Sequence, residues 1–161
     1  MRFTHQEVGY NYRLTNIQAA VGVAQMEHFD EAVEAKIEIA RNYTAALSGV
    51  DGLTLPPEAR WGKNVFWVYG IVVEKEFGLG RSVVQRLLRH AGIETRRFFT
   101  PIHRQPIFRS GATDGDYPTS VHLGENGLYL PSYIGMTKDT IVRIANAIRN
   151  CQSQRACIDV S

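Results

Sequence analysis

One short segment concentrates side chains that could bind a substrate. Residues 98–106 (FFTPIHRQP) place a histidine and an arginine between two prolines and after two aromatic rings. Prolines stiffen such a loop, and an imidazole next to a guanidinium can meet a phosphate or a sugar hydroxyl. The segment therefore marks His103, Arg104 and Phe99 as candidate substrate-binding residues. On the residues alone, a loop that simply packs on its own domain stays open as an alternative.

A second segment, residues 9–16 (GYNYRLTN), has the composition of an anion-binding arm. Thr15 and Gln18 have the spacing of a capping box, so a helix is predicted to begin here. An amide and an arginine directly before a helix N-terminus suit a phosphate group. The alternative is an ordinary helix lead-in, in which the aromatic side chains only staple the chain to the helix.

Other familiar catalytic patterns are missing from the sequence. Gly78 and Gly80 precede a predicted helix but lack the third glycine of a dinucleotide-binding loop, so they are interpreted as a turn. Neither G-x-S-x-G nor H-E-x-x-H occurs. Cys151 and Cys157 match no common zinc pattern and are expected to be reduced thiols. No metal site and no catalytic residue is predicted.

The chain resembles the DegT/StrS-type nucleotide-sugar aminotransferases, which depend on pyridoxal phosphate. Residues 9–25 (GYNYRLTNIQAAVGVAQ) are similar to the segment that follows the lysine region of that family. Residues 92–108 (GIETRRFFTPIHRQPIF) resemble its later substrate loop, most closely that of perosamine-synthase-type members. Residues 127–132 (GLYLPS) resemble its closing strand. The resemblance covers about residues 5–150.

The resemblance implies the small C-terminal domain of an enzyme with the aspartate aminotransferase fold (fold type I). In that family a large domain carries the lysine, and the active sites form at a dimer interface. By resemblance, Asn11 would reach the cofactor phosphate of a neighbouring subunit, with Tyr10 and Arg13 close by. His103 and its loop would face the nucleotide sugar. The implied role is amino-sugar or lipopolysaccharide biosynthesis.

The lysines depart from the family pattern. The chain has Lys36, Lys63, Lys75 and Lys138, and none stands in a serine-x-x-lysine setting before a glycine-rich turn. A Schiff-base lysine anchors pyridoxal phosphate and carries the proton of the 1,3-shift. We therefore expect the lysine-bearing domain to be missing, the chain to be inactive alone, and pyridoxal phosphate not to be bound appreciably by this portion.

Hydrophobic periodicity predicts three helical regions that would position these segments. The first spans Thr15–Leu47, either as one long amphipathic helix or as two with a break near Phe29–Asp30. The second follows Gly80 and stops at Gly92, and the third begins at Thr137.

Strands are predicted between these helices. Residues 64–73 are apolar on both faces and read as a central strand, and residues 93–99 and 128–130 are short strand candidates. Residues 100–126 are interpreted as loop with short helical pieces. The order predicts an α+β (or α/β) fold with helices packed on a small sheet. We expect an arm (1–14), one domain (15–150) and a frayed tail (151–161).

Composition narrows the class of protein further. A net charge of +2 with interspersed signs gives no footprint for nucleic acid, and no apolar run is long enough for a bilayer. The N-terminus lacks a secretory h-region, so a cytoplasmic protein is expected. We also expect a homodimer through Phe29, Val33 and Ile37, which a missing large domain would expose.

Two further readings stay open beside the fragment. The chain, whose Met1 falls directly before a family segment, is then either a stand-alone binding or oligomerisation module, or a small subunit that completes a separately encoded large domain.

Overall fold

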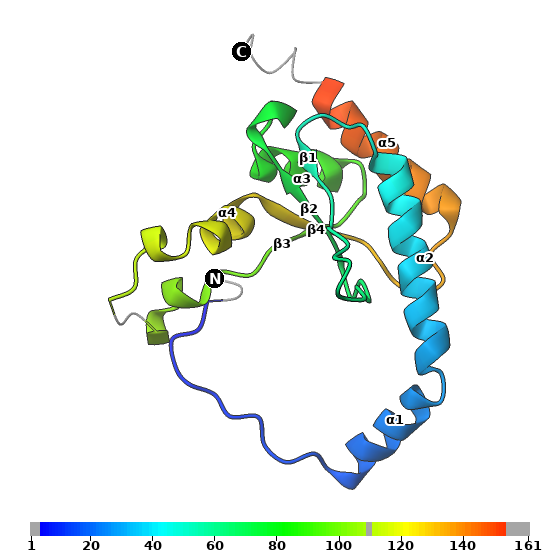
Figure 1. Ribbon diagram of the computed structural model, residues 1–161, viewed down its shortest axis with the longest axis vertical. Coiled ribbons are helices and arrows are strands. Elements are labelled where there is room, and N and C mark those ends of the chain that lie inside the picture. Colours follow the sequence, from blue (N-terminus) through cyan, green and yellow to red (C-terminus); the bar gives the residue numbers. More distant parts are fainter. Residues whose placement is uncertain (1–3, 109–110, 154–161) are drawn as a thin grey trace.

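The computed structural model describes residues 4–108 and 111–153, and the long helical segment predicted from Thr15 is two helices (Figure 1). Helix α1 (Asn16–Met26) begins at the predicted capping box: Thr15 Oγ1 accepts from the Gln18 amide, and Gln18 Oε1 accepts from the Thr15 amide. Helix α2 (Phe29–Leu47) follows after a short turn. The two-helix alternative is therefore confirmed.

The four strands of the described residues form one antiparallel sheet in the order β1-β2-β4-β3. Strand β2 (Tyr69–Val73) lies inside the sheet, as predicted, although it begins five residues later than the apolar run. Strand β3 (Arg96–Arg97) confirms the candidate at 93–99 in shortened form, and β4 (Gly127–Leu130) confirms the candidate at 128–130 and begins one residue earlier. The sequence did not reveal β1 (Leu53–Thr54). Antiparallel pairing makes the fold α+β.

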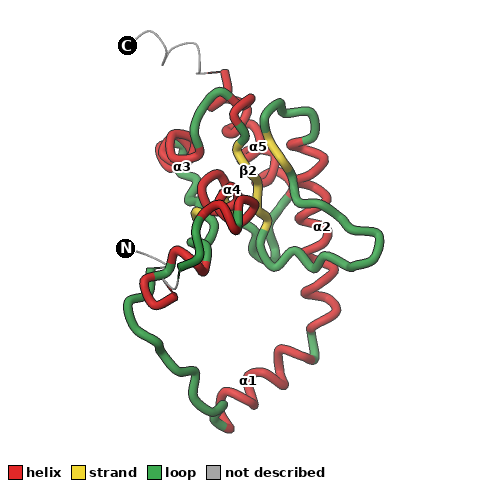
Figure 2. The backbone as a smooth tube through the Cα atoms, turned by 60° about the vertical axis from the view of Figure 1, so that its left-hand side comes forward, coloured by secondary structure: helices red, strands yellow, loops and turns green. Residues whose placement is uncertain are grey.

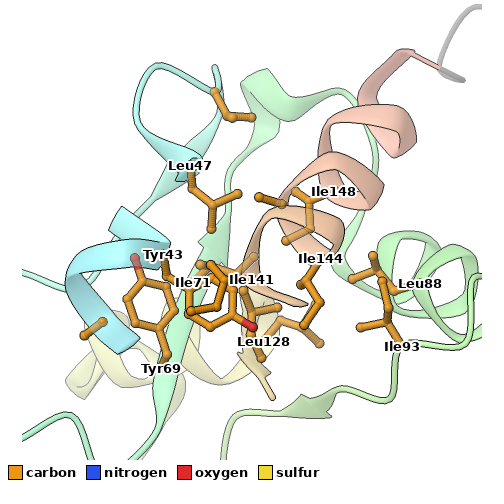
Figure 3. Packing of buried hydrophobic residues seen from close by; sticks show 14 of the residues in the cluster. Tyr43, Leu47, Tyr69, Ile71, Leu88, Ile93, Leu128, Ile141, Ile144 and Ile148 are labelled. Atoms are coloured by element: carbon orange, nitrogen blue, oxygen red, sulfur yellow. The ribbon is translucent and has the colours of Figure 1, made fainter. Parts of the chain in front are cut away.

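One hydrophobic core lies between the sheet and three helices (Figure 3). Helix α5 (Lys138–Ser153) packs against both α2 and α3 (Arg81–His90). Alternation along β2 turns every second side chain into this core, where the fully buried residues include Tyr43, Leu47, Tyr69, Ile71, Leu88, Leu128, Ile141, Ile144 and Ile148. The core residues of α2 and α5 follow the apolar stripes predicted from the sequence.

Residues 100–126 are loop with short helical pieces, as predicted, and these include α4 (Pro118–Asn126), which contacts β2, β3 and β4. Two sequence-based expectations need correction. The predicted frayed tail begins too early, because α5 continues to Ser153 and buries Cys151; residues 154–161, with Cys157, lie outside the described residues. Ile37 is buried in the core, so it is not available for the expected dimer contact.

No helix in the part of the chain that the structure describes is both long and apolar enough to cross a membrane. Within the same residues, no group of three or more histidine, cysteine, aspartate or glutamate side chains could hold a metal ion.

Candidate functional site

The loop that carries His103 is positioned by glycines on the sheet face opposite the core. The Phe98 ring stacks on Tyr129 with a centroid distance of 4.3 Å, and it lies directly over Gly70 and Gly127. A Cβ at Gly70 would lie 2.5 Å from Phe98 Cζ, and one at Gly127 would lie 2.2 Å from Phe98 Cγ. Only hydrogen at these two positions lets the ring lie flat on the strands. The ring in turn fixes where the loop leaves the sheet.

The neighbouring helix also approaches this loop through a glycine. A Cβ at Gly124 of α4 would lie 2.9 Å from Pro101 Cδ and 3.2 Å from the carbonyl oxygen of Phe99. The Phe99 ring is half exposed and meets the Tyr129 ring edge-on at 5.9 Å. The two consecutive phenylalanines therefore differ in role, since Phe98 holds the loop on the sheet and Phe99 presents a ring at the surface.

Beyond Phe99, the loop forms a charged cluster. His103 and Arg104 lie in one 3-10 turn (Ile102–Arg104). Arg104 binds Asp114 in a bidentate manner, with donor–acceptor distances of 2.8 and 2.6 Å, and also reaches Glu125 at 2.8 Å. His103 Nε2 lies 3.0 Å from the same Asp114 carboxylate. The cluster ties the loop to α4 and to the turn before it.

The electrostatics of this cluster give Arg104 and His103 different roles. Hydrogen bonds from Arg104, then from His103, hold the pKa of the Asp114 carboxyl well below its usual range. Hydrogen bonds to Asp114 and Glu125 raise the pKa of Arg104 above its ordinary value. Arg104 is thus bound to protein carboxylates, which suits a residue that holds the loop in place.

His103 keeps more of its bonding capacity. Its side chain is only 8% exposed and stacks on the Tyr117 ring at a centroid distance of 5.0 Å. Among the described residues, none bonds to its Nδ1. An imidazole held on both sides, with one nitrogen still open, can donate to or accept from a sugar hydroxyl or a phosphate oxygen.

The arm that carries the other candidate residues starts at this loop and then leaves it. The backbone amide of His5 donates to Oε1 of Gln105, a buried side chain. From there the arm arches away from the sheet to α1, as both views show (Figures 1 and 2). Tyr10, Asn11 and Arg13 are exposed along this arch. Within this chain the structure therefore brings His103 and Arg104 to one cavity, places Phe99 at another, and leaves the arm residues apart.

The four lysines lie away from both candidate segments. Lys36 donates to the Ser132 carbonyl, and burial lowers the pKa of its ammonium group. Lys63 pairs with Glu34 at the surface, at 3.7 Å. Neither these lysines nor the other two lie on the arm or line the cavity beside His103. Asn11 and Arg13 can donate to a phosphate, but no lysine stands beside them to anchor the cofactor.

Sequence reasoning missed most of the partners in this cluster. Asp114, Glu125 and Tyr117 have no local pattern that points to His103, from which they are 11 to 22 positions distant. One signal was available: Thr113 and Asp116 form a capping box around the turn that presents Asp114.

Comparison with known proteins identifies a family for residues 1–149. A family model described as the DegT/DnrJ/EryC1/StrS aminotransferase family matches residues 1–149. The chain is 35% identical to a GDP-perosamine synthase of Vibrio cholerae over 149 residues, and 36% identical to one of Caulobacter vibrioides over 148 residues. These matches cover 92% and 91% of this chain. The chain spans about 40% of the length of these curated relatives.

Solved structures agree on the fold. A structure of S. venezuelae DesV in complex with a ketimine intermediate superposes with a TM-score of 0.78 at 25% identity, over 94% of this chain and 40% of that one. The putative sugar aminotransferase Spr1654 of Streptococcus pneumoniae superposes with a TM-score of 0.79 at 17% identity, over 92% and 38%. The second likeness shows the fold alone.

Proposed function

Because this chain belongs to the DegT/DnrJ/EryC1/StrS aminotransferase family, we propose that it supplies the substrate-facing C-terminal portion of an aminotransferase for keto-sugar nucleotides. The observation that carries the proposal is the His103 loop. The sheet glycines fix where it leaves the strands, Arg104 ties it down, and His103 lines one cavity while Phe99 lines another. Amino-sugar and lipopolysaccharide synthesis is the setting that the perosamine synthases suggest.

The arm has the second role in this proposal. Asn11, with Tyr10 and Arg13, contributes donors to the cofactor phosphate in a neighbouring subunit. Its exposed, arching course supports this role, since nothing in the described part of this chain covers these side chains. Amide and guanidinium donors suit a phosphate dianion.

We place the contact with a second copy on α1 and the arm. Helix α1 buries none of its residues, although Ile17, Val21, Val23 and Met26 are each at least 60% exposed. Ile17 and Val21 share one face of the helix and Val23 and Met26 lie on the other, and exposed apolar surface of this kind marks an interaction site. The expected stripe on α2 retains only Phe29 as a largely exposed member. We therefore place the homodimer contact on α1 instead of on the α2 stripe of Phe29, Val33 and Ile37.

Transamination by this chain alone is not expected, because none of its lysines is placed to form the Schiff base. The test incubates the chain with pyridoxal phosphate, glutamate and a GDP-linked keto sugar, and follows product formation. In parallel, borohydride reduction and peptide mass spectrometry look for a lysine adduct. We expect no turnover and no adduct confined to one lysine. Measurable turnover, or a stoichiometric adduct at one lysine, would contradict the proposal.

The exposed apolar face also favours a second candidate function, a small subunit or binding module that docks on another chain. Analytical ultracentrifugation of the wild type and of a Val21→Asp variant separates the two. Self-association that the variant abolishes supports the dimer. A monomer at tens of micromolar contradicts the dimer and favours docking on a different, separately encoded chain.

A further inference from the structure

The arm that carries Asn11 is fastened at both of its described ends. At one end the backbone amide of His5 donates to Gln105 Oε1 at 3.0 Å. At the other end the capping box of Thr15 joins the arm to α1. Residues 6–14 form no helix or strand and arch between these two points (Figure 1). The two fastened ends, and not secondary structure of its own, therefore set the course of the arm.

The side chain that fastens the arm belongs to the His103 loop. Gln105 ends the 3-10 turn Ile102–Arg104, and its backbone amide donates to the Ile102 carbonyl oxygen at 3.0 Å. The same turn is bound to Asp114 through both His103 and Arg104. Gln105 itself is only 8% exposed. The arm is thus attached to the most firmly held part of the loop, by the residue that completes the turn of His103.

The attached end of the arm also forms part of the cavity beside His103. Thr4 is half-buried and lines this cavity of about 660 Å³. Arg81, the first residue of α3, and Arg97, the last residue of β3, line it as well. Because Thr4 directly precedes His5, this part of the cavity wall stays in place only while the arm is attached. The bond to Gln105 therefore affects both candidate segments.

Attachment at two points limits where Asn11 can lie. Asn11 is six residues from His5 and four from Thr15. An extended chain spans at most about 3.5 Å per residue, so Asn11 lies within roughly 20 Å of the first point and roughly 14 Å of the second. A segment held at both ends has fewer conformations to lose when it binds a ligand, so its binding groups are pre-organised.

We propose that Gln105 is a positioning residue, which holds the arm to the His103 loop so that one anchor places both Asn11 and His103. In this proposal Gln105 contacts neither the cofactor nor the nucleotide sugar. The ligands of Asn11 and His103 rest on the proposed function, whereas the anchor is a property of the free chain. Binding at either segment then orders the other, and the effect is reciprocal.

The test removes the donor of this bond and leaves the buried glutamine in place. His5→Pro has no backbone N–H, whereas His5→Ala keeps it and is the matched control. By NMR, the His5 amide of the wild type should exchange roughly 2- to 10-fold more slowly than in an unstructured peptide, as expected for one hydrogen bond. His5→Pro should make residues 6–8 mobile and shift the amide resonances of His103 and Gln105. His5→Ala should do neither.

Urea unfolding separates positioning from a general structural role. Residues 6–14 are exposed, so His5→Pro should keep the wild-type urea midpoint while it changes the His103 resonances. A lower midpoint with unchanged His103 resonances would overturn the inference. So would a His5→Ala variant that behaves like His5→Pro.

A second change tests the link from the loop to the arm. Asp114→Asn weakens the contacts that hold the loop, and in the wild-type background it should shift the amide resonances of residues 6–8. In the His5→Pro background these resonances should not respond. An equal response in both backgrounds, or none in either, would show that the arm and the loop are independent.

Titration with a GDP-linked keto sugar distinguishes this inference from the proposed function. If His5→Pro frees the arm as expected but the nucleotide sugar shifts no resonance of the loop or the arm, the anchor stands and the proposed function fails. If the nucleotide sugar shifts the His103 resonances of the wild type and leaves those of residues 6–8 unmoved, the proposed function stands and the positioning role of Gln105 fails.

Discussion

The glycines beneath Phe98 give a prediction whose size follows from the geometry. Gly70→Ala adds a methyl group 2.5 Å from Phe98 Cζ, and its other close contact is Tyr129 Cδ1 at 3.3 Å. Both contacts are with ring atoms, which can move. Gly127→Ala meets Phe98 Cγ at 2.2 Å and, in addition, the carbonyl oxygen of Leu123 at 2.5 Å. That oxygen belongs to the backbone of α4 and cannot rotate away.

Overpacked sites lose about 1–3 kcal/mol of unfolding free energy, and sometimes more. We therefore expect Gly70→Ala to cost about 1–2 kcal/mol and Gly127→Ala about 3 kcal/mol. Urea unfolding followed by circular dichroism measures both. Gly115→Ala is the matched control, because its methyl group would meet only Thr113 Oγ1 at an ordinary 3.6 Å. This control should unfold like the wild type.

A Phe98→Ala background distinguishes the contacts with the Phe98 ring from the contact with the Leu123 backbone oxygen. In a Phe98→Ala protein the ring is gone, so Gly70→Ala should add almost no further loss. Gly127→Ala should still destabilise that protein, since the Leu123 oxygen remains. In the wild-type background, Gly127→Ala should also shift the amide resonances of Thr100 and His103. The reasoning is refuted if both alanines are harmless, or if Phe98→Ala removes both penalties equally.

Three further outcomes are expected. Thr15→Ala removes the capping box of α1 and should destabilise that helix by about 1 kcal/mol. Circular dichroism should show a loss of helical signal, while the urea midpoint of the domain stays unchanged because α1 buries no residue. Asp114 has a folded-state pKa below its ordinary value of 3.8. Its contribution to the free energy of unfolding is therefore complete above pH 3.8 and is lost as the pH falls through the folded-state pKa. Asp114→Asn should flatten the dependence of stability on pH in this acidic range. Cys151 is buried and burial raises its thiol pKa, so peptide mass spectrometry should show alkylation far slower in the native chain than in urea; equal rates would contradict this.

Local patterns predicted the elements well where burial and periodicity agree. Helices α2, α3 and α5 were predicted because their apolar residues recur at helical spacing and do face the core. Helix α4 was predicted only as short helical pieces within a loop, because Gly124 lies in its interior and an isolated glycine costs a helix about 1 kcal/mol. Its packing against three strands offsets that cost. The same glycine lets Pro101 approach, which no pattern along the chain reveals.

An apolar stripe indicates that something covers a helix face, but not what covers it. The pattern around Ile37 suggested a contact with a second copy, and the structure shows that the chain's own core covers it. The pattern of α1 is similar, yet Ile17 and Val21 stay exposed. In both cases the apolar residues indicate only that a helix surface is covered and carry no information about what covers it. Only the position of each helix relative to the sheet distinguishes them.

The residues of the candidate site also fall into two groups: those that one local segment reveals and those that only the fold brings together. His103 and Phe99 were found from one loop, since their residue types and the flanking prolines are adjacent in sequence. Arg81 and Arg97 were not, because eighteen basic and sixteen acidic residues scattered along the chain give no footprint. Their proximity depends on the register that pairs Arg97 with Leu128 and on the position of α3 beside β4. The fold therefore brings residues that lie far apart in the sequence to one cavity, where burial and then the charge of Arg97 lower the pKa of Arg81.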